Sequence, residues 1–128
     1  MFHYTVETSM GIEEAAKQLE ETLKAEKFGV LWQFNVKDKL QEKGLDFDQE
    51  YLILEVCNPH EAKEVLSINK MIGYFLPCKI VLYTDSGKTK IGMPKPTEFV
   101  KLIDDANLEA KAKDIEDRLI ACLDKSVQ

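Results

Sequence analysis

The sequence has few cysteines and glycines, three and six in 128 residues, and both shortages argue against particular classes of protein. Three cysteines do not make the disulfide framework of a small secreted domain, which leaves metal binding, redox chemistry or burial as their roles. The glycines stand singly, so no glycine-rich loop cradles a phosphate. The motifs GxGxxG, GxxxxGKS/T, GxSxG and HExxH are absent, and two histidines are little material for a catalytic triad. The sequence therefore leaves enzymatic activity uncertain and leans against it.

Long apolar runs and an excess of positive charge are also missing. No apolar stretch approaches the ~20 residues that span a bilayer, and MFHYTVETSM has no basic segment followed by an apolar run, as a signal peptide would. We therefore expect a cytoplasmic protein without a membrane partner. The 17 basic residues are outnumbered by 23 acidic ones, which gives a net charge of −6. Because binding to a phosphate backbone needs a basic face, we expect no nucleic-acid partner.

What the sequence does contain is the composition of an ordinary globular domain, with 45% hydrophobic and 31% charged residues. Its length suits a single domain over 1–128, with a helical region at 97–128. Alternating apolar residues predict strands over 2–7, 30–36 and 50–57, and the last of these is apolar enough at its centre to be internal. In the second strand we expect Val30, Trp32, Phe34 and Val36 to share one face.

The helices have start signals and periodic apolar positions of their own. Apolar residues spaced by three and four predict a helix from Gly11 to Lys27, and 37–44 is predicted as a short helical turn. Asn58, Pro59 and Glu61 resemble a capped helix start, and this helix is expected to end near Asn69. Asp85-Ser86-Gly87 indicates the turn of a β-hairpin.

Two apolar stripes in the C-terminal region are about half a turn out of phase, so one straight helix could not bury both. We therefore predict a break near 104–107, or a second half that packs on a partner subunit. The first stripe contains Phe99, Leu102, Ile103 and Ala106, and the second contains Leu108, Ala112, Ile115, Leu119 and Cys122. The expected fold is α+β, with an antiparallel or mixed sheet of about five strands and helices packed on one face.

Two cysteines beside prolines are the candidates for a functional site. Cys57 ends a predicted strand just before a helix N-terminus, where free N–H groups favour a thiolate. Cys78 follows Pro77 at the start of another strand. If the two strand ends meet, Cys57, Cys78 and His60 (or His3) form a soft ligand set for zinc or copper, and the same cysteines could instead form a reversible disulfide. When Cys57 is considered by itself, we favour the interpretation that it is a small residue packed in the core over the interpretation that it is a reactive thiolate.

Other residues give weaker signals. Glu55 is two residues before Cys57, so both side chains are expected on the same face of the strand. Glu55 either faces a pocket or faces solvent, and the solvent-facing arrangement is the commoner one. Cys122 lies on an apolar helical stripe and is interpreted as packing. Six aromatic residues could line an apolar pocket between sheet and helices or simply fill the core, and these are Trp32, Phe34, Tyr51, Tyr74, Phe75 and Tyr83.

The motifs CNP and, some twenty residues later, GYFLPCKIVLY resemble the family catalogued as domain of unknown function 302. The similarity includes KFGVLWQFNVKDKLQEKG and EYLILEVCNPHEAKEVL, and it runs from about Val6 to Met93. This resemblance implies a compact α+β domain in which a curved antiparallel sheet grips helices, and it implies a homodimer. It implies no activity.

We therefore predict a small domain that acts as a binding module. Its ligand site, at Cys57, Cys78 and Glu55, would take a soft metal or a thiol-reactive ligand, with Cys57, Cys78 and His60 as the metal ligands. One alternative is a small-molecule carrier with an apolar cleft between sheet and helices. The other is a thiol oxidoreductase in which Cys57 attacks and Cys78 resolves.

Overall fold

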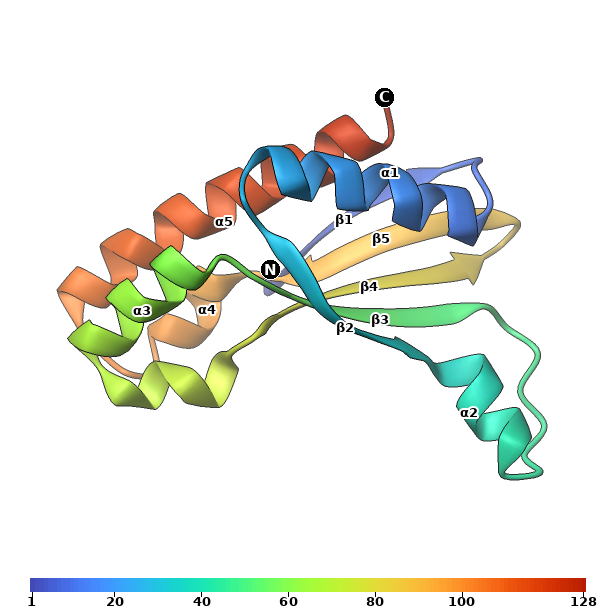
Figure 1. The fold of residues 1–128 in the computed structure, drawn as a ribbon, viewed down its shortest axis with the longest axis horizontal. Helices are drawn as coiled ribbons and strands as arrows, with labels where there is room; N and C mark the ends of the chain where they lie inside the picture. Colours follow the sequence, from blue (N-terminus) through green and yellow to red (C-terminus); the bar gives the residue numbers. More distant parts are fainter.

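A computed structural model describes all residues from 1 to 128 and contains one five-stranded sheet (Figure 1). The strand order is β1-β5-β4-β3-β2, and every neighbouring pair is antiparallel. The elements are β1 (His3–Thr8), α1 (Ile12–Ala25), β2 (Gly29–Asn35), α2 (Val36–Glu42), β3 (Tyr51–Cys57), α3 (Pro59–Ile68), the 3-10 helix η1 (Lys70–Phe75), β4 (Cys78–Asp85), β5 (Lys88–Pro94), α4 (Pro96–Val100) and α5 (Ala106–Ser126). The predicted α+β fold is confirmed, with an antiparallel rather than a mixed sheet.

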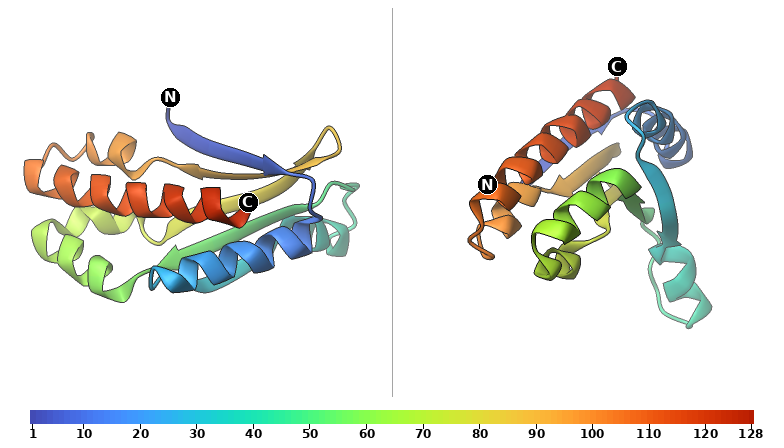
Figure 2. Two further views of the ribbon diagram at one scale, coloured as in Figure 1. Left: turned by 90° about the horizontal axis from the view of Figure 1, so that it is seen from above. Right: turned by 60° about the vertical axis from the view of Figure 1, so that its left-hand side comes forward.

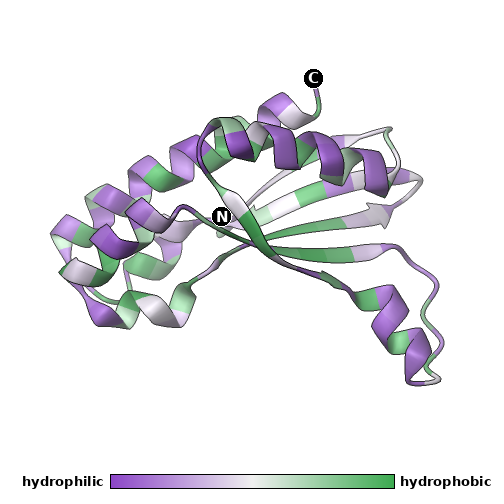
Figure 3. Ribbon diagram, in the orientation of Figure 1, coloured by the Kyte–Doolittle hydropathy of each residue, from purple (hydrophilic) through white to green (hydrophobic).

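One face of the sheet is covered by α1 and α5, which lie side by side (Figure 2). Hydrophobic stretches are concentrated in the strands, whereas the helices alternate between hydrophobic and hydrophilic residues along their length (Figure 3). The buried strand residues of the covered face are Leu52, Leu54, Val56, Ile80, Leu82, Ile91 and Met93. Against them pack Ala15, Leu19 and Leu23 of α1 and Leu108, Ala112, Ile115, Leu119 and Leu123 of α5.

The opposite face of the sheet, which we call the open face, has no helix across its centre (Figure 2). Because side chains alternate along a strand, the strand register assigns its residues. The open face comprises His3, Thr5, Glu7, Trp32, Phe34, Tyr51, Ile53, Glu55, Cys57, Lys79, Val81, Tyr83, Asp85, Lys88, Lys90, Gly92 and Pro94.

The start of α3 confirms the helix start predicted at Asn58. Asn58 Oδ1 accepts hydrogen bonds from the backbone N–H groups of His60 (3.1 Å) and Glu61 (3.3 Å), and Pro59 occupies the first turn. The Glu61 side chain does not reach back to complete a capping box, because it pairs with Arg118 on α5 instead.

The hairpin between β4 and β5 is also confirmed. Ser86 and Gly87 form its two-residue turn with φ of 52° and 79°, and Asp85 lies opposite Lys88. Positive φ at both turn positions matches the twist of the flanking strands, and the glycine adopts it without the steric cost of a side chain.

The predicted face of β2 is wrong, because a β-bulge interrupts the strand. Val30 lies opposite Val56 on the covered face, but the register shifts before Trp32, which lies opposite Glu55. One extra residue moves every following side chain to the other face. Trp32 and Phe34 therefore belong to the open face, and Val36 already begins α2.

The predicted break in the C-terminal region is confirmed. α4 ends at Val100 and α5 begins at Ala106, and Asp104 in the connection has a φ of 60°. The second apolar stripe is buried along α5, as expected. Leu102 of the first stripe is not, because it lies in the connection and is 78% exposed.

One element of the structure was not predicted, and one predicted helix lies apart from the body of the molecule. The 3-10 helix η1 was not predicted, and it fills the segment between α3 and β4. The short helix α2 was predicted, but it projects away from the body of the molecule and buries none of its residues (Figure 1). None of the helices combines the length and the apolar composition that crossing a membrane would require.

Candidate functional site

A cavity of about 380 Å³ lies where β3 ends, β4 begins and β5 ends. The helices α3, α4 and α5 and the 3-10 helix η1 surround it beyond the end of the sheet. Thirteen of its eighteen lining residues are hydrophobic, so the cavity is suited to an apolar molecule.

The longest wall of the cavity is one face of α5. Leu108, Ala112, Ile115 and Leu119 follow each other at spacings of four, three and four, which places all of them on one side of the helix. All four are buried, although they also face the cavity. The continuous apolar stripe that packs α5 on the sheet thus continues past the sheet edge as one wall of the cavity.

Two short helices, η1 and α4, form another wall of the cavity. Different contacts hold each of them in place. Phe75 of η1 stacks on Phe99 of α4, with ring centroids 5.2 Å apart and ring planes at 14°. Thr97 donates from its backbone N–H (3.1 Å) and its hydroxyl (2.7 Å) to Oε1 of Glu116, a buried residue of α5. One carboxylate therefore fastens α4 to α5, while an aromatic pair connects α4 to η1.

Two charged residues belong to the lining, and they are neighbours. Glu55 on β3 lies directly opposite Lys79 on β4, and both line the cavity. Cross-strand pairs of opposite charge on one face of a sheet lie close enough to interact. A bound molecule would therefore meet one polar pair in otherwise apolar surroundings. Glu55 is half-buried on the open face, on the same side as Cys57, as its strand parity predicted.

The two candidate cysteines are close in the sheet but point to opposite faces. Cys78 lies opposite Val56 on the covered face and lines the cavity. Cys57 follows Val56, so its side chain emerges on the open face. Both thiols are free. The strand ends do meet, as the first hypothesis requires, but the register separates the side chains.

The surroundings of both thiols disfavour a thiolate, which agrees with the interpretation of Cys57 as a small packing residue rather than an activated one. Burial raises the pKa of the Cys57 thiol, and burial together with the nearby Cys57 raises the pKa of Cys78 to about 11. The helix N–H groups that would have stabilised an anion at Cys57 are already bonded to the Asn58 side chain. The effect of burial on the pKa of Cys57 is therefore larger than any lowering by the N-terminus of α3.

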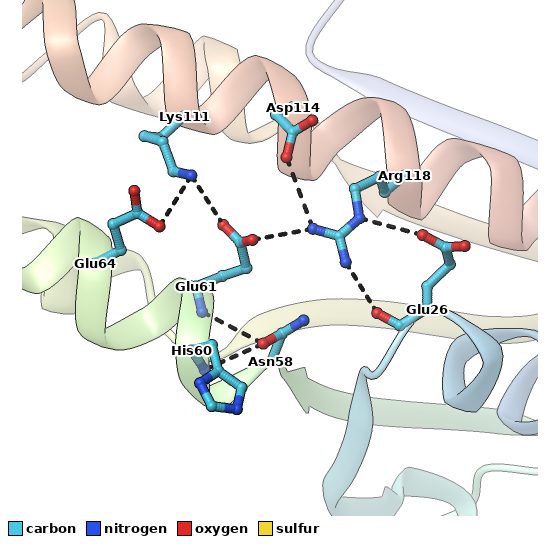
Figure 4. Close-up of polar contacts among 8 residues, drawn as sticks. All are labelled: Glu26, Asn58, His60, Glu61, Glu64, Lys111, Asp114 and Arg118. Atoms are coloured by element: carbon cyan, nitrogen blue, oxygen red, sulfur yellow. Dashed lines mark hydrogen bonds and ion pairs between the residues drawn. The ribbon is translucent and has the colours of Figure 1, made fainter.

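The metal ligands predicted from the sequence are not assembled into a site. No group of three or more His, Cys, Asp and Glu side chains is placed to hold a metal ion. His60 is exposed on the first turn of α3, and its ring points away from the nearby ion pairs (Figure 4). His3 lies on β1 and donates to or accepts from the Thr5 hydroxyl at 2.9 Å.

An ion-pair network joins α3 and α5, two of the helices around the cavity, to the end of α1 (Figure 4). Arg118 of α5 donates to Glu61 of α3 (3.1 Å), to the Glu26 carboxylate (3.2 Å) and to the Glu26 backbone carbonyl (2.9 Å). Its guanidinium also lies 5.2 Å from the centre of the Phe28 ring. The other oxygen of Glu61 has no hydrogen-bond donor and is compensated by Lys111 at 3.4 Å. The network is structural, since it joins α1, α3 and α5.

Two groups of residues in the sequence partly indicated this site. Of the six aromatic residues considered for a pocket, Tyr74 and Phe75 line the cavity, and the other four lie on the open face. Three of the four prolines also line it, namely Pro77, Pro94 and Pro96. Because proline ends strands, this grouping was a signal for the end of the sheet. Phe99 and Met93 had no comparable signal.

Comparison with known proteins extends the resemblance through the C-terminal helices. The family model described as domain of unknown function DUF302 matches residues 4–126. A crystal structure of an uncharacterized conserved protein DUF302 from Bacillus stearothermophilus is 60% identical in sequence, covers 98% of each chain and superimposes with a TM-score of 0.96. No curated protein matches the chain. With nearly its whole length matched by the family model and by this structure, the chain belongs to the family of the domain of unknown function DUF302.

Proposed function

We propose that this protein binds a small molecule with an apolar body and a polar end in the cavity at the end of the sheet. The observation that carries the proposal is the cavity itself, about 380 Å³ in volume and mainly hydrophobic. Protein interiors are normally packed with few voids larger than a water molecule. Ligand pockets span roughly 300–1,000 Å³, so this space has the size of a small-ligand site.

The lining indicates how such a molecule would be oriented. The apolar body would lie along the α5 wall between Ala112 and Leu119, and the polar end would lie at Glu55 and Lys79. Cys78 would contact the molecule as a neutral, polarisable thiol, because its raised pKa keeps it protonated at neutral pH. This combines the ligand site expected at Cys78 and Glu55 with the apolar cleft of the carrier hypothesis.

The other hypotheses from the sequence gain less support. A soft metal would need Cys57 and Cys78 to converge, and their side chains emerge on opposite faces of the sheet. An oxidoreductase would need Cys57 as an activated thiolate, whereas burial raises its pKa. Binding without a covalent step requires neither condition.

The proposal is tested by titrating the protein with N-phenyl-1-naphthylamine, a neutral apolar dye that fluoresces when it leaves water. Ala112→Leu fills part of the cavity from the α5 wall, and we expect it to weaken dye binding at least about tenfold. Ala110→Leu makes the same change at an exposed position of the same helix and should bind as the wild type does.

A second variant guards against misfolding of the first. Val65→Leu adds a single methylene from α3, on another wall of the cavity, and should weaken the dye in the same direction. Circular dichroism checks that each variant is folded. Equal dye affinity in the wild type, Ala112→Leu and Val65→Leu would contradict the proposal, as would the same loss in Ala110→Leu.

A further inference from the structure

We propose that the outer surface of α3 and η1 binds to the surface of a membrane that contains anionic lipids. This α3–η1 surface comprises Lys63 and Leu66 of α3 and Lys70, Met71 and Tyr74 of η1, and all five are exposed. It lies beside the cavity, because Tyr74 also belongs to the cavity lining. The contact itself does not depend on the proposed ligand.

The apolar side chains of the α3–η1 surface are neighbours in space. The two helices pack against each other at one end of the molecule (Figure 1). Gly73 of η1 lies against α3, since a Cβ atom added to it would be 3.6 Å from Leu66 Cδ2. Met71 and Tyr74 flank this glycine and are 46% and 82% exposed. Single exposed apolar residues are ordinary, whereas exposed apolar residues that adjoin one another commonly mark an interaction site.

The charges of this region are separated between two sides of α3. Glu61 and Glu64 turn toward α5 and pair with basic residues there (Figure 4). Lys63 lies on the side of the helix away from Glu61, because two residues correspond to about 200° of rotation. Neither Lys63 nor Lys70 forms an ion pair with a carboxylate of the chain. Two uncompensated positive charges therefore accompany the apolar side chains, although the whole chain carries −6.

Lysines interspersed with aromatic and aliphatic side chains suit the boundary between lipid headgroups and acyl chains. Tyrosine is enriched at that boundary, and a lysine near an anionic surface strengthens binding roughly fivefold. An acidic peptide would pair with the lysines without requiring apolar side chains such as Met71 and Tyr74 beside them. Charge and apolar character together therefore favour a lipid surface as the partner.

This contact differs from the expectation of no membrane partner, which rested on the lack of a long apolar run. Binding at the surface of a bilayer needs no spanning segment. A molecule with an apolar body and a polar end partitions into membranes, so contact at Tyr74 would place the cavity next to a source of such molecules. That consequence, unlike the contact, rests on the proposed function.

Co-sedimentation of the full chain with lipid vesicles tests the proposal. At low salt the wild type should bind vesicles made from equal parts of phosphatidylcholine and phosphatidylglycerol, and it should bind phosphatidylcholine vesicles much less. Added salt should weaken binding to the anionic vesicles, because it screens the lysines. The double variant Lys63→Gln/Lys70→Gln should bind them about 25-fold more weakly, about fivefold for each lysine. Lys17→Gln/Lys24→Gln makes the same change of charge at exposed positions of α1 and should bind as the wild type does.

A second pair of variants tests the apolar part of the surface. Met71→Ser removes a half-exposed apolar side chain that does not line the cavity, and it should weaken binding by about fivefold. Leu45→Ser makes a similar change after α2, at the other end of the molecule (Figure 1), and should leave binding unchanged. Circular dichroism checks that each variant is folded.

Three outcomes would overturn the proposal. The first is a wild type that binds neither kind of vesicle, and the second is equal binding to both kinds. The third is a loss in Lys17→Gln/Lys24→Gln as large as the loss in Lys63→Gln/Lys70→Gln, because the attraction would then not be specific to the α3–η1 surface. None of these measurements uses the dye, so failure of the membrane contact and failure of the ligand site are distinguishable.

Discussion

Each of the three cysteines has a different environment, and none resembles an activated nucleophile. Cys57 is half-buried on the open face, and Cys78 is half-buried in the cavity lining. Cys122 is buried between α5 and α1, with its Sγ 3.5 Å from the Thr22 carbonyl oxygen, as its place on the apolar stripe predicted. Burial raises the pKa of all three, to about 11 for Cys78 and Cys122.

These pKa shifts predict the pH dependence of alkylation by iodoacetamide. Only the thiolate reacts, and a pKa raised from 9.0 to about 11 leaves about a hundredfold less thiolate at pH 8. Cys57 should therefore be alkylated first. The rate at Cys78 should rise with pH until about pH 11, because the folded state holds its proton over that range. Peptide mass spectrometry after timed labelling measures each rate, and fast labelling of Cys78 at pH 7 would contradict this assignment.

At the scale of elements, the local signals were more informative than the long-range ones. The start of α3 at Asn58 and the turn at Ser86 and Gly87 could be predicted because each depends on neighbouring residues. The bulge before Trp32 could not, because it is defined by pairing with β3. The cavity had the weakest signal of all, since its walls come from seven separate elements. The cysteines were located at strand ends correctly, but their faces depended on register.

Arg118 connects its own helix, α5, to α3 and to the end of α1. Arg118→Met keeps an apolar side chain over Phe28 but leaves Glu61, whose side chain is 18% exposed, without its main partner. We expect the free energy of unfolding to fall by about 2 kcal/mol, below the value for a fully buried ion pair because Arg118 is 27% exposed.

Urea denaturation measures this loss, with Lys113→Met as the matched control. Lys113 pairs with Asp117 on the exposed side of α5, where such pairs contribute about 0.5 kcal/mol or less. Equal losses in the two variants would show that Arg118 has no special role between the helices.

At the scale of the whole molecule, the cavity and the open face of the sheet share one pair of residues. The cavity lies beyond the end of the sheet, among α3, η1, α4 and α5, whereas the open face spans all five strands. Glu55 and Lys79 belong to both, because they line the cavity and lie on the open face.

The most direct test of ligand binding is a crystal structure of the wild type and of Ala112→Leu under xenon pressure. Xenon occupies apolar cavities that are empty and reachable from solvent. We expect a xenon peak in the wild type between Val65, Met93 and Leu119, and a weaker peak or none in Ala112→Leu. A wild-type cavity filled by its own side chains, with no xenon, would contradict the proposed ligand site.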